Sequence, residues 1–238
     1  MIKSTMNRVL LVMALLSVAL VANAQGKVDT LYYDMDDCLI GQPAFAIRQR
    51  VVYTPSDSAI KSYIDYNLRT GKIMEEGKCS SIIINGNKAE IVREGRVVQY
   101  NDNGSVQTEC HFHNGKEHGT GKFYDQNGIL EWSITYADGV PHGELLHFVN
   151  GSLSEKRTYA HGLLNGKTIT YYPNGNKSVE FDYVNDKEHG KTIVYHENGN
   201  IATSVDMVNG VKHGVYKIYD ETGKLVTVVK VVNGQYIL

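Results

Sequence analysis

Histidine recurs in this sequence of 238 residues at one kind of position, directly before the glycine that opens an internal repeat. Imidazole nitrogens are common metal ligands, so a series of histidines along one edge of a fold could hold a transition metal. Their spacing follows the internal period of the chain, however, whereas a metal ion needs ligands that converge on one point. We therefore expect exposed imidazoles at corners of the fold and no bound metal. The series consists of His118, His142, His189 and His213.

Two smaller groups of possible ligands are also present. His111 and His113 alternate along one predicted strand, so their side chains point the same way and form at best a weak chelate. The acidic cluster of Asp34, Asp36 and Asp37 could pair carboxylates for acid–base chemistry or hold a cation. No glycine turn or distal glutamate completes a calcium loop there, which favours a solvated turn.

The three cysteines are Cys38, Cys79 and Cys110, and their wide spacing is unlike that of a zinc site. An oxidising compartment would permit one disulfide and leave one thiol over. Alternatively, the cysteines are small buried side chains without a bond between them. The sequence leaves both possibilities open.

Catalytic signatures are absent from the sequence. It has no nucleophile elbow, no cysteine–histidine signature and no glycine-rich phosphate loop before a helical pattern. The formal net charge is −2, with no strong basic excess, which argues against a nucleic-acid partner. We therefore expect no catalytic residue, no enzyme activity, no cofactor and no small-molecule substrate.

The first 24 residues have the features of an export signal. Lys3 and Arg8 give a positively charged start, and an uncharged, mostly apolar run follows from residue 9 to residue 22. This run is shorter than the stretch of about 20 residues that a membrane-spanning helix needs. Ala22-Asn23-Ala24 then forms a small-x-small cleavage pattern. We predict cleavage after Ala24 and export of the mature chain.

An internal period of about 24 residues organises most of the chain. Residues 166–189 read GKTITYYPNGNKSVEFDYVNDKEH, and residues 190–213 read GKTIVYHENGNIATSVDMVNGVKH. Six copies can be counted, and the third has one residue fewer than its neighbours. The copies begin at Gly95, Gly119, Gly143, Gly166, Gly190 and Gly214.

Each copy is punctuated in the same way. An aromatic residue stands five positions after the opening glycine, and an Asn-Gly or Thr-Gly turn comes next. Asparagine and glycine accept the positive φ that hairpin turns require. Alternating apolar residues then follow, as in Leu130, Trp132 and Ile134, which is typical of a half-buried strand. The aromatic residues are Tyr100, Tyr124, Phe148, Tyr171, Tyr195 and Tyr219.

These patterns predict an all-β fold, an elongated array of antiparallel β-hairpins that forms a twisted sheet or open solenoid. A lone hairpin is marginal in water, so we expect stacked hairpins to join their apolar faces in one continuous core. We expect residues 25–60 to cap the first edge and residues 61–94 to hold degenerate repeats. Residues 95–238 then contain the six copies.

The copy that begins at Gly143 departs from the others at positions that should face inward. Glu155 and Arg157 stand between Leu153 and Tyr159, where the usual pair in the other copies is apolar. An internal ion pair or a local adjustment of register would explain the charged residues. Alternatively, they form a polar interruption of the sheet that helps to recognise a partner. Glu155 and Arg157 are therefore the candidate interaction residues.

With their opening glycine, aromatic residue and two turns, the copies resemble the MORN-repeat family, and more closely its bacterial variant. The stretches DTLYYDMDD (29–37) and DYNLRTGKIMEEG (65–77) are similar to the start of exported Bacteroidetes repeat proteins. Bacterial relatives are often labelled antitoxin components of toxin–antitoxin modules. The resemblance therefore implies an interaction protein as well as a hairpin fold.

We expect a non-catalytic repeat protein of the cell envelope that is periplasmic, associated with the outer membrane or secreted. It would act as a scaffold that binds an envelope protein, a glycan or a membrane surface. The alternative is an antitoxin-like or immunity-like inhibitor of a secreted toxin.

Overall fold

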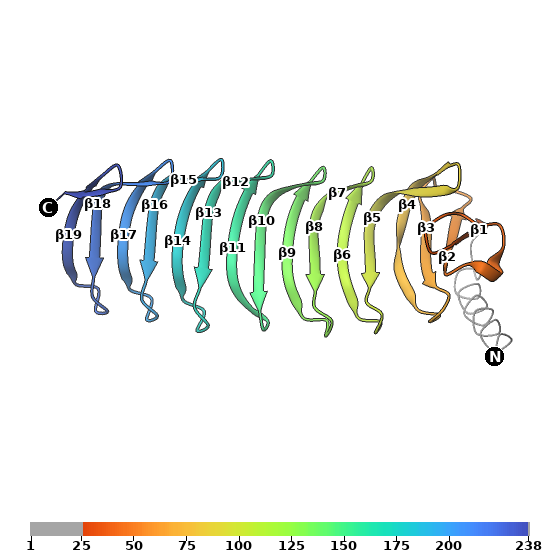
Figure 1. The fold of residues 1–238 in the computed structure, drawn as a ribbon, viewed down its shortest axis with the longest axis horizontal. Coiled ribbons are helices and arrows are strands. Elements are labelled where there is room, and N and C mark those ends of the chain that lie inside the picture. The colour runs from red at the N-terminus through yellow and green to blue at the C-terminus, as the bar shows by residue number, and fades with distance from the viewer. Residues whose placement is uncertain (1–25, 238) are drawn as a thin grey trace. The chain divides into compact units, whose positions relative to one another are not determined.

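The computed structural model describes residues 26–237, and the predicted signal peptide at residues 1–24 lies outside them. The chain divides into two compact units. Unit 1 comprises residues 26–118 and 126–128, and unit 2 comprises residues 119–125 and 129–237. Nearly all regular structure in both units is antiparallel β-strand (Figure 1). No helix in the described part is long and apolar enough to cross a membrane.

The strands of unit 1 pair in chain order, each antiparallel to the one before it. A short 3-10 helix, η1 (Pro43–Phe45), lies between the first two strands. The strands are β1 (Gly26–Tyr33), β2 (Arg48–Pro55), β3 (Lys61–Asn67), β4 (Ile73–Asn85), β5 (Lys88–Tyr100), β6 (Val106–His113) and β7 (Lys116–Glu117).

The hydrophobic core of unit 1 lies beside the long hairpin of β4 and β5. Strand β3 pairs with β4 only as far as Cys79, whereas the β4–β5 hairpin continues beyond this point. From the overhanging part, Ile82 and Ile91 pack against a cluster of Val52, Tyr63 and Cys79. The three clustered side chains are at most 1% exposed. The overhang thus gives unit 1 a covered apolar cluster.

The strands of unit 2 also follow one another as antiparallel neighbours, and Figure 1 shows them side by side in chain order. Very short strands precede two of the hairpins and bridge onto the strand before them. The strands are β8 (Gly119–Tyr124), β9 (Leu130–Ala137), β10 (Val140–Val149), β11 (Ser152–Ala160), β12 (Leu163–Leu164), β13 (Gly166–Tyr171), β14 (Lys177–Val184), β15 (Lys187–Glu188), β16 (Gly190–Tyr195), β17 (Ile201–Val208), β18 (Val211–Tyr219), β19 (Leu225–Val232) and β20 (Gln235–Ile237).

Each repeat hairpin carries a β-bulge just before its aromatic residue. In β13 and β14, Thr170 faces Val179 and Tyr171 faces Lys177, so that Ser178 is an extra residue without a direct partner. Equivalent shifts of register precede the aromatic residue in the other hairpins of the array. Because of this extra residue, the two strands pair in a different register next to the first turn than along the rest of the hairpin.

Two kinds of turn alternate along the array. In the first turn of most copies only the glycine has positive φ, as at Gly175 and Gly199. The second turns have two consecutive residues with positive φ, as at Asn209 and Gly210, which is the pattern of a two-residue type I′ turn. The shortened first turn of the third copy, at Asn150 and Gly151, adopts this second pattern.

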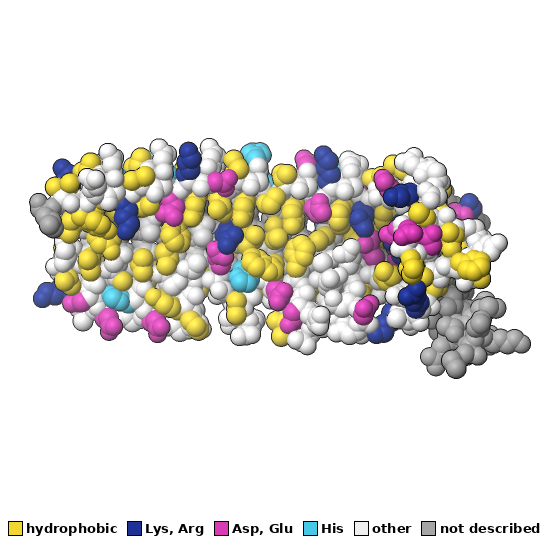
Figure 2. Space-filling view, viewed as in Figure 1, with side chains coloured by type: hydrophobic (Ala, Val, Ile, Leu, Met, Phe, Trp, Pro, Cys, Tyr) yellow, Lys and Arg dark blue, Asp and Glu magenta, His cyan; other side chains and the backbone are white. Residues whose placement is uncertain are grey.

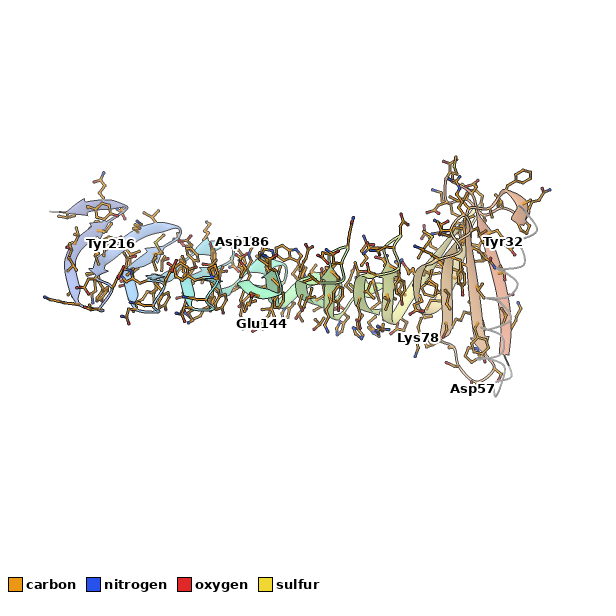
Figure 3. All side chains as sticks on the ribbon, turned by 90° about the horizontal axis from the view of Figure 1, so that it is seen from below. Tyr32, Asp57, Lys78, Glu144, Asp186 and Tyr216 are labelled. Atoms are coloured by element: carbon orange, nitrogen blue, oxygen red, sulfur yellow. The ribbon has the colours of Figure 1, made fainter. Side chains whose placement is uncertain are left out.

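The predicted all-β array of antiparallel hairpins is confirmed, but the expected continuous core is wrong for unit 2. Its strands form a single layer, and side chains project to both sides of it (Figure 3). Most of these side chains remain half-buried, since no second layer covers either face among the described residues. The buried hydrophobic side chains of unit 2 are scattered along the array: Leu145, Ile169, Val205, Met207 and Val231.

Candidate interaction surface

Unit 2 presents two different faces. Residues directly opposite each other in antiparallel strands share a face, and neighbours along one strand alternate between faces. In Figure 2, hydrophobic side chains form a band along the middle of the strands of unit 2. We call one side of the sheet the aromatic face. By the observed register it carries Trp132, Ile134, Leu145, Tyr159 and Phe181.

The sequence-predicted pair, Glu155 and Arg157, lies on the aromatic face in strand β11. The Arg157 Nε donates to Glu155 Oε1 at 2.8 Å, and Nη2 donates to Oε2 at 2.9 Å. These two parallel hydrogen bonds form a bidentate ion pair. The Glu155 side chain is 17% exposed and that of Arg157 is 36% exposed, so the pair remains within reach of solvent.

An aromatic stack lies directly beside this ion pair. The rings of Trp132 and His147 have centroids 3.9 Å apart and planes inclined by 12°. The two residues face each other across β9 and β10, and His147 in turn faces Glu155 across β10 and β11. Three adjacent strands therefore bring a flat aromatic surface and a fixed ion pair into one row.

Tyrosines continue the surface on the other side of the ion pair. Hydrogen bonding to Glu155 raises the pKa of Arg157, and Tyr159 contributes to the same shift. Burial raises the pKa of Tyr183, with the nearby Glu188 as a further cause. The guanidinium is thus charged and the Tyr183 phenol is neutral at physiological pH. We call Trp132, His147, Glu155, Arg157, Tyr159 and Tyr183 the candidate surface.

The opposite side of unit 2, here called the charged face, has a different character. Lys156 pairs with Glu144 there, next to Arg157 in sequence but on the other side of the sheet. The Lys167 Nζ atom lies 2.5 Å from Glu180 Oε1. Oppositely charged side chains therefore offset one another along this face, as they do on many solvated sheets. Figure 3 labels Glu144 among these side chains.

The four histidines that precede the opening glycine of a repeat are exposed, as the sequence predicts. Ring contacts instead join His142 to His161, with centroids 4.9 Å apart, and His118 to His113. Neither of these two ring contacts joins two members of the series. Within residues 26–237, no three histidine, cysteine or acidic side chains are arranged to hold a metal ion.

The acidic cluster forms a turn in which Asp34 is the organising residue. Its Oδ1 accepts hydrogen bonds from the backbone N–H groups of Asp36 and Cys38, each at 3.0 Å. Asp37 has positive φ and pairs with Arg48 at 3.2 Å. The carboxylates of Asp34 and Asp37 are therefore engaged in contacts that shape the turn.

No disulfide joins the three cysteines, all of which lie in the described part of the chain. Cys79 is fully buried in the unit 1 cluster, where burial raises the pKa of its thiol. Cys110 is also buried, at 9% exposure, and Cys38 is half-buried in the acidic turn. Two of the three thus fit the alternative of small buried side chains.

Unit 1 contains a second polar group that the sequence did not reveal. Glu75 accepts hydrogen bonds from Tyr63 Oη at 2.5 Å, Gln99 Nε2 at 2.8 Å and Arg93 Nη2 at 2.9 Å. Although burial raises the pKa of Glu75, these hydrogen bonds hold it below its ordinary value. Nearby, Arg50 donates two hydrogen bonds of 2.6 Å to the buried Asp65. These largely buried carboxylates, each hydrogen-bonded to an arginine, form a structural network.

A pocket of about 200 Å³ also lies in unit 1. The Arg48 guanidinium in its wall stacks on the Tyr33 ring at 4.0 Å and pairs with Asp37, so its charge is already offset. The residues that line this pocket do not include a nucleophile paired with a base. The pocket is lined by Asp37, Ile47, Arg48, Asn67, Arg69 and Met74.

Sequence reasoning missed His147 as a member of the candidate surface. The alternation of apolar residues places Trp132 on a strand face, and it is the only tryptophan in the chain. Its contact with His147 depends on the register between β9 and β10, which shifts between Pro141 and Leu145. A single sequence does not reveal such a shift. The rarity of tryptophan was the one available signal.

Comparison with protein families gives five matches to the MORN repeat variant. Together they cover just under half of the chain. No curated protein matches the sequence. The matched segments are residues 93–114, 117–138, 164–185, 188–209 and 212–233.

The unmatched interval, residues 139–163, contains His147, Glu155 and Arg157. It corresponds to the third of the six copies counted from the sequence, the copy with the shortened turn. The predicted resemblance to the MORN repeat variant is therefore confirmed for the regular copies. Five of the six copies thus match the MORN repeat variant, and the third copy, which contains Glu155 and Arg157 of the candidate surface, does not.

Proposed function

We propose that the protein is a non-catalytic scaffold of the cell envelope that binds its partner through the candidate surface of unit 2. One observation carries this proposal. The repeat that departs from the family pattern is the repeat that places the Glu155–Arg157 ion pair beside the Trp132–His147 stack. The regular repeats supply the frame, and the divergent repeat supplies distinctive chemistry.

The residue types of the surface support a binding role. Tryptophan, tyrosine and arginine dominate the energetics of protein interfaces, because they combine a large contact area with directed hydrogen bonds. The same aromatic rings can stack on the apolar side of a sugar ring. The partner we propose is accordingly an envelope protein, a glycan or a membrane surface.

The envelope location rests on the amino-terminal sequence. A positively charged start, a short apolar run and a small-x-small pattern precede residue 25. Intact mass and amino-terminal sequencing of the chain from its native cells would test export. A chain that begins at Gln25 supports it, and a cytosolic chain that retains residues 1–24 contradicts it.

Affinity purification of the mature protein from its native envelope tests the binding role. Captured proteins are identified by mass spectrometry, and lipids and glycans are assayed directly. Because Trp132 is the only tryptophan, its fluorescence reports whether a captured partner reaches the candidate surface. A saturable change in Trp132 fluorescence on adding the partner supports the proposal. An emission spectrum that stays unchanged while the partner binds would show that the interface lies outside the candidate surface. Capture of a secreted nuclease or peptidase would favour the inhibitor alternative.

A further inference from the structure

Asparagine–glycine steps are frequent in this chain, and they differ in the hydrogen bonds that their glycine N–H groups make. In such a step the glycine nitrogen can attack the preceding side-chain amide, because glycine has no side chain to obstruct the approach. A glycine N–H that donates a hydrogen bond must first give up that bond. The hydrogen bonding of each glycine amide therefore determines how readily its step can react.

Most of these glycine amides are engaged. In the second turns, the N–H of Gly115, Gly210 and Gly234 donates to a backbone carbonyl of the preceding repeat, at 2.8–3.0 Å. In the first turns, the N–H of Gly175 and Gly199 donates within the turn, at 2.9 Å. These bonds restrain the backbone at the reacting nitrogen.

Three glycines of Asn-Gly turns in residues 26–237, Gly86, Gly128 and Gly151, donate no backbone hydrogen bond through their N–H groups. Asn127, which precedes Gly128, has an interaction partner, whereas the side chains of Asn85 and Asn150 make no hydrogen bond within that part of the chain. Two steps, Asn85-Gly86 and Asn150-Gly151, therefore lack both restraints. All four residues are exposed. Both glycines belong to two-residue hairpin turns, between Asn85 and Lys88 and between Val149 and Ser152.

We propose that Asn85 and Asn150 are the sites of spontaneous deamidation in the folded protein. The glycine nitrogen forms a bond to the asparagine Cγ, and the Cγ–Nδ2 bond breaks. The proton of the glycine N–H leaves with the amide nitrogen as ammonia, and a five-membered succinimide remains. Water then opens this ring at either carbonyl carbon and gives aspartate or isoaspartate, without oxidation or reduction.

The site at Asn150 has a structural consequence. It replaces a neutral amide by a carboxylate in the turn that joins β10 to β11, the strands that carry His147, Glu155 and Arg157. Isoaspartate also adds a backbone carbon to a turn of two residues, which disfavours the pairing of Val149 with Ser152. Deamidation at Asn150 therefore changes both the charge and the turn geometry of the third copy.

Incubation of the mature protein at mildly alkaline pH, followed by digestion and fragment sequencing, tests the proposal. The readout is the mass increase on conversion of an amide to a carboxylate, with isoaspartate distinguished by its backbone fragments. We expect Asn85 and Asn150 to convert about fivefold or more faster than Asn114, Asn209 and Asn233, as expected for a hydrogen bond of ordinary strength.

The same chain unfolded in denaturant is the control. There, the five steps compared above should convert at similar rates, and among these five folding should slow only Asn114, Asn209 and Asn233. Equal rates at all five steps in the folded chain would overturn the proposal. Protection of Asn85 and Asn150 by folding would overturn it as well. Neither outcome depends on the proposed binding role.

Discussion

At the residue scale, the glycine that opens each repeat has two tasks. Gly166 has φ of +117°, and a Cβ at this position would lie 3.2 Å from the Thr158 side chain on the preceding strand. Gly166 also faces Tyr183 across its own hairpin. The glycine thus allows both the left-handed backbone and the close approach of two strands.

Replacement of Gly166 by alanine should lower the free energy of unfolding by about 1–3 kcal/mol, because it adds both backbone strain and a tight contact. Gly175→Ala is the matched control. Gly175 also has positive φ, but a Cβ at this position would have no other atom within 4 Å. Urea denaturation should show the larger loss for Gly166→Ala, and equal losses would refute the role assigned to Thr158.

The Glu155–Arg157 ion pair should matter more for recognition than for stability. Replacing partly buried ion pairs with apolar side chains is often neutral or stabilising. We expect the double variant Glu155→Val, Arg157→Ile to unfold within about 1 kcal/mol of the wild type. Partner capture should nevertheless fall. A variant that is more stable and binds unchanged would assign the pair to structure alone.

Glu75 makes the stability of unit 1 depend on pH. Its pKa is lowered in the fold, so its ionisation stabilises the folded state above the unfolded pKa of about 4.3. That contribution is lost as the pH falls through the lower folded value. The gap in unfolding free energy between wild type and Glu75→Gln should therefore narrow below about pH 4.3. A gap that is constant with pH would show that the carboxylate charge is not involved.

At the element scale, asparagine side chains connect successive turns. The Nδ2 groups of Asn174 and Asn176 both donate to the carbonyl oxygen of Glu197, at 2.8 Å. One repeat later, Asn198 and Asn200 do the same with Glu221, at 2.7 Å. We call these contacts the asparagine ladder. They align each first turn with the next.

The double variant Asn174→Ala, Asn176→Ala should reduce stability by about 1–2 kcal/mol, since it removes two hydrogen bonds between repeats. Glu197→Ala is the control, because the acceptor is a backbone carbonyl that this change leaves in place. It should alter stability by less than about 0.5 kcal/mol. Thermal unfolding distinguishes the two, and a larger effect of Glu197→Ala would argue against the asparagine ladder.

The sequence predicts these elements well but not their register. Period-two alternation and Asn-Gly turns identify the hairpins, since both are local properties. The bulge that leaves Ser178 unpaired has no comparable local signal. Nor does the contact between Asn174 and the next turn, which spans 23 residues. The Glu155–Arg157 pair was visible as a departure from the repeat, whereas the stack of Trp132 on His147 needed the register.

At the scale of the whole molecule, the two units bury their apolar side chains to different extents. Unit 1 covers Val52, Tyr63 and Cys79 with the overhang of its long hairpin and adds the network around Glu75. Unit 2 keeps its strands in one layer and leaves much of its apolar surface half-buried. Repeating units stabilise such an array mainly through contacts between neighbours. An accessible aromatic face is the consequence of that architecture.

Repeats of this kind also allow one copy to diverge while its neighbours preserve the fold. The third copy keeps the glycine, the bulge and the paired strands. It differs in its turn and in the side chains on the aromatic face. We infer that this combination separates the structural requirements of the array from its recognition chemistry.

Partner capture by two neighbouring variants tests this account most directly. Arg157 and Lys156 are adjacent in β11, are each ion-paired, and have similar side-chain exposures of 36% and 31%, but they point to opposite faces. Arg157→Ala should reduce capture of the native envelope partner about tenfold or more, as truncation of an interface anchor does. Lys156→Ala should leave capture unchanged. Equal capture by both variants, or a loss only with Lys156→Ala, would contradict binding through the candidate surface.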